Sequence, residues 1–129
     1  MRLSGRSAFI TGAAKGIGLS VAKAFSKEGA TVALADMSGD ESIRQASEIE
    51  AETGNKALGV ECDVADKQSV ENAIEETVEA FGTIDTLACM AATMTVRHDV
   101  VDLSEEDWDR TLRVNVTGSF FACKYVIPL

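Results

Sequence analysis

The chain has 129 residues, of which 46% are hydrophobic and 26% are charged, and this composition is typical of one folded, soluble domain rather than of a disordered or fibrous protein. Its 21 acidic residues outnumber the 12 Lys and Arg, and a net charge of -9 argues against nucleic acid or an anionic membrane as partner. The three cysteines form no C-x-x-C pair and no apolar segment is long enough to cross a bilayer, so we expect a cytoplasmic protein without a disulfide framework or a metal site.

Short apolar runs alternate along the chain with segments of helical periodicity. The runs predict strands at 7–11, 31–35, 57–61 and 85–90, and each strand is followed by a predicted helix. Strands that alternate with helices pair in parallel through right-handed crossovers. The sequence therefore predicts a doubly wound α/β sheet with helices on both faces.

The last part of the chain contains the longest predicted loop, residues 93–103. Ser104 then caps a final helix whose first turn, residues 105–107, is acidic, as the helix dipole favours. Trp108 and Leu112 on this helix are interpreted as core packing residues.

A glycine-rich turn joins the first predicted strand to the first helix. Glycine lets the backbone bend and brings its amides against a pyrophosphate at the positive end of a helix. The spacing is G-x-x-x-G-x-G, and the absence of Gly-Lys-Ser/Thr excludes a phosphate loop of the nucleotide triphosphatase kind. The candidates for cofactor binding in this turn are Gly12, Lys15, Gly16, Ile17 and Gly18.

An acid ends the second strand. Asp36 lies 18 residues beyond Gly18, close to the roughly 20 at which a carboxylate binds the ribose hydroxyls of NAD. This carboxylate would repel the additional phosphate of NADP. Lys15 is the one residue that favours NADP, because its basic side chain could bind that phosphate. We therefore expect NAD as the cofactor, with NADP less favoured.

These features together resemble the short-chain dehydrogenase/reductase family. The resemblance rests on T-G-x-x-x-G-I-G, on the acid closing the second strand and on Cys62-Asp63-Val64 closing the third, and it covers essentially the whole chain. It implies a single NAD-binding Rossmann domain over residues 1–129 with strand order 3-2-1-4. It also implies that Asp63 binds the adenine amino group, that Val64 flanks the ring, and that hydride passes between nicotinamide and an alcohol or ketone.

The end of the fourth strand departs from the family pattern. Where that pattern has Asn-Asn-Ala-Gly, this chain has Cys89-Met90-Ala91-Ala92, so only Ala91 matches. Ala91 and Ala92 are candidates for cofactor contact, and Cys89 and Met90 are interpreted as core residues.

Asn115, in the run Arg-Val-Asn-Val-Thr-Gly, matches the family's active-site asparagine. Asparagine suits a helix interior poorly, because its amide competes with backbone hydrogen bonds. The resemblance implies a catalytic role for Asn115, in which it distorts the helix and holds a water in a proton relay.

The Ser and the Tyr-x-x-x-Lys that the family's reaction needs cannot be assigned. Tyr125 has Leu129 four positions later and is interpreted as a packing residue. We expect a truncated or incomplete enzyme that is inactive alone. The strand order that the resemblance implies leaves the fourth strand unpaired, and the resemblance also implies that the helix carrying Leu112, Val116 and Phe120 packs across an oligomer interface. We therefore expect a homo-oligomer, a dimer or a tetramer.

Two other functions stay open at this point. The chain could be a non-catalytic NAD-binding module that regulates a partner. A phosphoacceptor receiver domain has a similar α/β rhythm, with Asp63 at the end of its third strand, but it requires an acidic pair after the first strand, where this chain has Thr11 and Gly12.

Overall fold

The computed structural model describes residues 1–94 and 98–129, so residues 95–97 of the predicted loop lie outside the described residues. Four strands form one sheet in the order β3-β2-β1-β4, and every pair is parallel. The strands are β1 (Ser7–Thr11), β2 (Thr31–Asp36), β3 (Ala57–Glu61) and β4 (Thr86–Cys89). The predicted parallel, Rossmann-like sheet and its strand order are confirmed.

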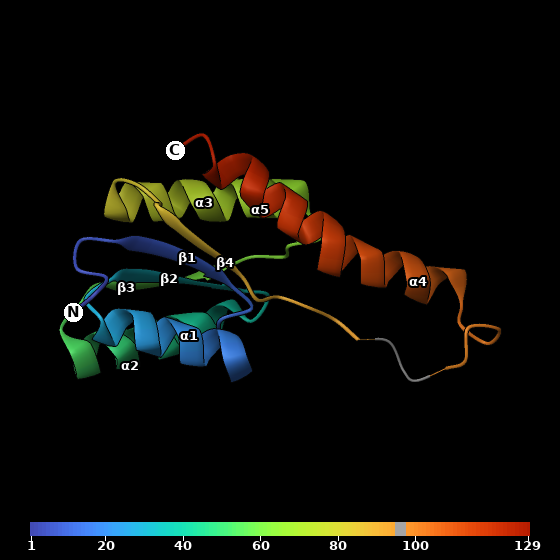
Figure 1. Cartoon of the computed structure of the whole chain (residues 1–129), viewed down its shortest axis with the longest axis horizontal. Coiled ribbons are helices and arrows are strands. Elements are labelled where there is room, and N and C mark those ends of the chain that lie inside the picture. Colours follow the sequence, from blue (N-terminus) through green and yellow to red (C-terminus); the bar gives the residue numbers. More distant parts are fainter. Residues whose placement is uncertain (95–97) are drawn as a thin grey trace.

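Helices cover both faces of this sheet, as predicted. In Figure 1, α1 (Gly16–Lys27) and α2 (Gly39–Thr53) lie on one face, and α3 (Lys67–Phe81) and α5 (Gly118–Val126) lie on the other. Two further helical segments, α4 (Glu105–Leu112) and η1 (Arg113–Thr117), run directly into α5. Ser104 caps α4 as predicted, because its hydroxyl accepts a hydrogen bond of 3.1 Å from the Asp107 amide.

The core consists of two apolar clusters, one on each face of the sheet. Alternate side chains of a strand point to opposite faces, so in β1 Phe9 packs toward α3 and α5 while Ala8 and Ile10 pack toward α1 and α2. All three are completely buried. Burial on both sides explains why the strands read as continuous apolar runs.

The contact between α2 and β3 is unusually close. A Cβ atom added at Gly59 would lie 2.3 Å from both the Ile43 amide nitrogen and the Ser42 carbonyl carbon. The backbone of α2 therefore lies almost directly on the strand, and this position admits no side chain.

The region from β4 to α5 is more open. In the described part of the chain β4 pairs only with β1, and Figure 1 shows α4 extending beyond the sheet. Trp108 is 53% exposed and Leu112 is also exposed, so their interpretation as core residues is wrong. Cys89 is likewise exposed rather than buried, because it ends an edge strand. Met90 and Tyr125 are partly buried against the core, in line with the predicted packing.

Across residues 1–94 and 98–129, no helix has both the length and the apolar character that crossing a bilayer requires.

Candidate functional site

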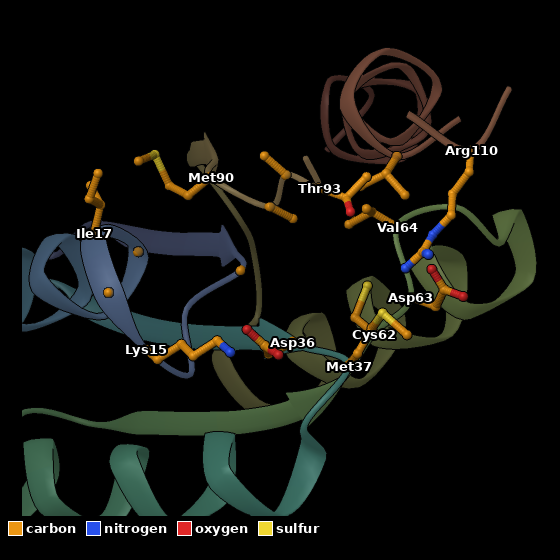
Figure 2. Close-up of a pocket in the computed structure, with 16 residues that line it drawn as sticks. Lys15, Ile17, Asp36, Met37, Cys62, Asp63, Val64, Met90, Thr93 and Arg110 are labelled. Atoms are coloured by element: carbon orange, nitrogen blue, oxygen red, sulfur yellow. The ribbon is translucent and has the colours of Figure 1, made fainter. Parts of the chain in front are cut away.

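A cavity of about 430 Å³ lies where the strands end and the first helix begins. Figure 2 shows side chains from the glycine turn, from the ends of β2 and β3, and from α4 surrounding it. All ten residues predicted to contact a cofactor line this cavity: Gly12, Lys15, Gly16, Ile17, Gly18, Asp36, Asp63, Val64, Ala91 and Ala92. The fold thus brings together residues from four separate segments, and their binding of a cofactor stays a prediction.

Close backbone packing shapes the glycine turn. Gly12 has a φ of +63°, and a Cβ there would lie 2.7 Å from the Ala91 Cα. A Cβ at Gly18 would lie 2.2 Å from the Gly12 carbonyl oxygen. A Cβ at Gly16, in contrast, would meet no described atom within 4 Å. The first two glycines let parts of the chain pack together, whereas Gly16 borders open space.

The start of α1 is arranged to receive an anion. Its N-cap is Lys15, no side chain within the described residues caps it, and its first turn contains no acid. The Leu19 amide donates to the Lys15 carbonyl oxygen at 3.3 Å, which leaves the three preceding amides without an intrahelical acceptor. The N-termini of α3 and α4, in contrast, are capped by Asp66 and Ser104, and α2, which also has no side-chain cap, has two acids in its first turn. The positive end of α1 therefore faces the cavity without a capping side chain.

The Asp36 carboxylate has a fixed orientation. Its Oδ2 accepts a hydrogen bond of 3.1 Å from the Ala14 amide, and its Oδ1 accepts one of 3.0 Å from the Ser38 amide. Each carboxylate oxygen has a second lone pair, so both can accept a further hydrogen bond from a hydroxyl group. Asp36 thus joins the glycine turn to the segment after β2 and presents acceptors at the cavity.

Several carboxylates converge at the end of the cavity that β3 forms. Cys62 is buried there, and burial followed by the charges of Asp63, Asp36 and Asp66 raises the pKa of its thiol to about 12. The Asp63 Oδ1 accepts a hydrogen bond of 2.9 Å from the Ala65 amide. In Figure 2, Arg110 reaches from α4 toward Asp63. This end of the cavity is therefore acidic at its base, with a cation at its rim.

Thr11 is a positioning residue that the sequence analysis did not select. Its buried hydroxyl oxygen accepts hydrogen bonds from the Met90 amide at 3.0 Å and from the Ala91 amide at 3.1 Å. These bonds hold the segment after β4 against the end of β1. One feature of the sequence could have indicated this role: Thr11 is a hydroxyl residue at the last position of a buried strand, immediately before Gly12.

Asn115 lies in the π-helical segment η1 and does not line the cavity itself. Its Oδ1 accepts a hydrogen bond of 2.8 Å from the Thr93 amide, and its Nδ2 donates one of 2.9 Å to the Thr93 carbonyl oxygen. Thr93 does line the cavity. The helix is distorted at this position, as the resemblance implies, and the catalytic role of Asn115 stays a prediction.

The described residues contain no group of three or more His, Cys, Asp or Glu side chains arranged to hold a metal ion. Met37, Cys62, Thr93, Arg110 and Val114 also line the cavity, although the motifs did not select them. Their position depends on how the segments pack, which short-range spacing does not encode.

Comparison with known proteins decides the family. The model of the short chain dehydrogenase family matches residues 6–129. The chain belongs to this family. The sorbitol dehydrogenase of Cereibacter sphaeroides is 36% identical over 126 residues, which cover 98% of this chain and 47% of that protein.

Two further members extend the comparison. The D-threitol dehydrogenase of Mycolicibacterium smegmatis is 37% identical over 97% of this chain and 47% of its own length. The crystal structure of a short-chain type dehydrogenase/reductase from Mycobacterium marinum matches with a TM-score of 0.91 and 36% identity, over 98% of this chain and 49% of that one. The chain thus spans about half the length of the relatives that it matches.

Proposed function

We propose that this member of the short-chain dehydrogenase family is the NAD-binding part of an oxidoreductase that acts on an alcohol or a ketone, and that residues 1–129 form one dinucleotide-binding domain. The observation that carries the proposal is the uncapped N-terminus of α1, which faces the cavity beside the open side of Gly16. Uncapped amides at a helix N-terminus suit a pyrophosphate.

The residues around the cavity fit the parts of a dinucleotide. The first amides of α1 would bind the pyrophosphate, Asp36 would accept hydrogen bonds from the adenosine ribose, and Asp63 and Val64 would contact the adenine. Ala91 and Ala92 would lie beside the nicotinamide ribose. The nicotinamide ring, when bound, accepts or supplies the hydride. Asn115 would position the cavity wall through Thr93, to which it makes two hydrogen bonds.

Electrostatics favour NAD over NADP. A phosphate on the adenosine ribose would face the fixed Asp36 carboxylate, in a region where burial and then the charges of Asp63, Asp36 and Asp66 raise the pKa of Cys62. A like-charge clash in a partly dry site costs a few kcal/mol, whereas the exposed Lys15 contributes about 1 kcal/mol or less in return.

Calorimetric titration of both cofactors into the purified chain tests this choice. We expect NAD to bind more tightly than NADP. Asp36→Ala should narrow the difference in affinity, because it weakens the binding of NAD and removes the charge repulsion that opposes the binding of NADP. Glu79→Ala on α3 removes the same charge far from the cavity and should leave the ratio unchanged. Equal or tighter binding of NADP with Asp36 intact would show that Lys15 sets the preference instead.

We also propose that the 129-residue polypeptide alone has no dehydrogenase activity, because it contains neither the Tyr-x-x-x-Lys nor an assigned Ser. Loss of a proton-transferring group typically lowers the rate by a factor of about 100 to 10,000. Sorbitol and D-threitol, which appear in the names of two relatives, are the first substrates to test. NADH formation at an ordinary enzymatic rate by a chain of verified mass would refute this part.

A second candidate function is a non-catalytic NAD-binding module. The encoding reading frame separates the two. Continuation beyond Leu129 into a Ser and a Tyr-x-x-x-Lys supports the enzyme, whereas a stop codon there supports the module.

We further propose that the chain forms a homo-oligomer. Four apolar side chains four residues apart on α4, η1 and α5 are exposed: Trp108, Leu112, Val116 and Phe120. We call this set the apolar stripe. Exposed large apolar side chains at helical spacing are typical of a protein interface, and a second copy of the chain offers the same side chains.

A further inference from the structure

The loop after β3, residues 63–65, stands between two cavities, and we call it the β3 loop. Asp63 and Val64 line the cavity of the candidate site, and Asp63 and Ala65 line a second cavity of about 440 Å³ beside it. Toward α3, the Asp63 amide donates a hydrogen bond of 2.9 Å to the Ser69 hydroxyl. Because cavities border the β3 loop on two sides, its position depends on a few contacts with the neighbouring helices.

Arg113 connects the β3 loop to η1. Its Nε donates a hydrogen bond of 2.8 Å to the Ala65 carbonyl oxygen, 48 residues earlier in the chain. Its guanidinium carbon lies 5.0 Å from the centre of the Phe121 ring, which is buried and attracts the cation to its face. The Arg113 side chain is therefore held at two points, although the residue is exposed.

The same helical segment holds the opposite wall of the cavity. Asn115 makes two hydrogen bonds with the backbone of Thr93, which lines the cavity after β4. A Cβ added at Gly118 would lie 2.9 Å from the Val64 Cβ, so the start of α5 also contacts the β3 loop directly. These contacts, together with the Arg113 hydrogen bond, link the loop after β3 to the segment after β4.

We propose that Arg113 is a positioning residue for the adenine half of a dinucleotide, and that it acts by holding the β3 loop through the Ala65 carbonyl. This inference rests on the proposed function, which assigns Asp63 and Val64 to the adenine. The Ala65 amide donates a hydrogen bond of 2.9 Å to the Asp63 Oδ1, so the residue that Arg113 holds in turn orients the Asp63 carboxylate. A loop that is already ordered loses less entropy when a ligand binds.

Two variants of nearly equal length separate the hydrogen bond from the other properties of the side chain. Arg113→Gln keeps an N–H donor at the same number of bonds from the backbone as the arginine Nε, whereas Arg113→Met places a methyl group there. Both variants remove the charge over Phe121. Arg44→Met on α2 is the control, because Arg44 is also an exposed helical arginine, hydrogen-bonded to Glu41 and Glu48, and it does not line the cavity.

Titration of the isotopically labelled 129-residue chain with adenosine monophosphate, followed through its amide NMR signals, tests the proposal. We expect Arg113→Met to raise the dissociation constant by about three- to tenfold, whereas Arg113→Gln and Arg44→Met should stay within about twofold of the wild type. In the free chain, Arg113→Met should shift the Ala65 amide signal and leave those of the glycine turn in place. A general loss of stability would instead affect signals throughout the chain.

The wild-type chain supplies a second measurement, which does not depend on the folding of a variant. The Arg113 Nε–H signal should be protected from exchange with water, because this group donates to the Ala65 carbonyl oxygen. It should also shift when adenosine monophosphate binds. An unprotected signal that the ligand does not move would overturn the proposal.

The outcomes of the titration separate this proposal from the proposed function. Equal affinity of Arg113→Met and the wild type would overturn the positioning role and leave the proposed function intact. Equal losses in Arg113→Met and Arg113→Gln would also overturn it, because they would assign the effect to the charge over Phe121 rather than to the bond with Ala65. Failure of the wild-type chain to bind adenosine monophosphate would contradict the proposed function itself, on which this inference rests.

Discussion

The two ends of the sheet differ in how completely the chain covers them. At the β2 and β3 end, the strand residues Val32 and Leu34 are completely buried, and α2 lies directly on Gly59. At the β4 end, none of the residues of α4, all of which the structure describes, is buried, and Trp108 is 53% exposed.

The apolar residues of the two regions therefore contribute to different free energies, one of folding and one of association. The closed region, which supplies Asp36 and the glycine turn, gains its stability from packing within the chain. The open region, which supplies Thr93 and Asn115, exposes apolar surface that is available for association. Substitutions in the closed region should therefore change the free energy of unfolding, and substitutions on the outer face of the open region should change association.

The largest effect is expected from Gly59→Ala in the closed region. The new methyl group would collide with the α2 backbone at 2.3 Å and should cost about 3 kcal/mol or more in the free energy of unfolding, measured by urea denaturation. Gly82→Ala is the control, because Gly82 has a φ of +87° but no described atom within 4 Å of the added Cβ. It should cost about 1 to 2 kcal/mol, from backbone strain alone. Equal costs would contradict the close contact between α2 and β3.

A smaller loss of stability is expected at the junction of the two regions. Thr11→Val keeps the shape of the side chain but removes the acceptor of the Met90 and Ala91 amides, which should cost about 1 to 3 kcal/mol. The matched control is Thr77→Val, since the buried Thr77 hydroxyl only donates to the Ala73 carbonyl oxygen within a helix. We expect less than about 1 kcal/mol for Thr77→Val in thermal or urea unfolding. A smaller loss for Thr11→Val than for Thr77→Val would exclude the bracing role of Thr11.

In the open region, Trp108→Gln should affect association rather than folding. We expect the dissociation constant of the proposed homo-oligomer to rise by about tenfold or more, while the free energy of unfolding of the monomer changes by less than about 0.5 kcal/mol. Sedimentation equilibrium measures the first quantity and dilute-solution unfolding the second. Ile43→Gln is the control, because Ile43 is also exposed but lies on α2 in the closed region. If both variants weaken association equally, the apolar stripe is not the interface.

The smallest expected effect concerns pH and a surface pair on α2. Hydrogen bonds from Arg44 and then Gln45 lower the pKa of Glu41 to about 2. A lowered folded-state pKa stabilises the folded chain above the ordinary value of 4.5, and this contribution is lost as the pH falls toward 2. Thermal unfolding of the wild type and Glu41→Gln should therefore differ slightly at pH 6 and converge near pH 2. A difference that does not vary with pH would rule out this ion pair as its source.

Local patterns predicted the closed region well. Its strands follow continuous apolar runs and its helices end near glycines, and both signals come from neighbouring residues. Thr11 was missed because its hydrogen-bond partner Met90 is 79 residues away. Likewise, the motif indicated Asn115, but its contact with Thr93, 22 residues away, required the fold.

The open region shows the limit of periodicity. Trp108 and Leu112 lie on the apolar face of a helix. Their spacing predicts that one face of the helix is apolar, but it does not indicate which part of the protein packs against that face. The prediction of core packing was wrong because α4 extends past the sheet.

The π-helical turn at Arg113–Thr117 also sets the rotational phase of the helix that follows it. In a continuous α-helix, Trp108 and Phe120 would differ by about 120° around the axis, since each residue advances the helix by about 100°. A turn widened by one residue takes back about 100° of this rotation, so both side chains come to the same side. The irregularity that places Asn115 against Thr93 therefore also aligns the outer surface, and removing one residue from this turn would misalign both at once.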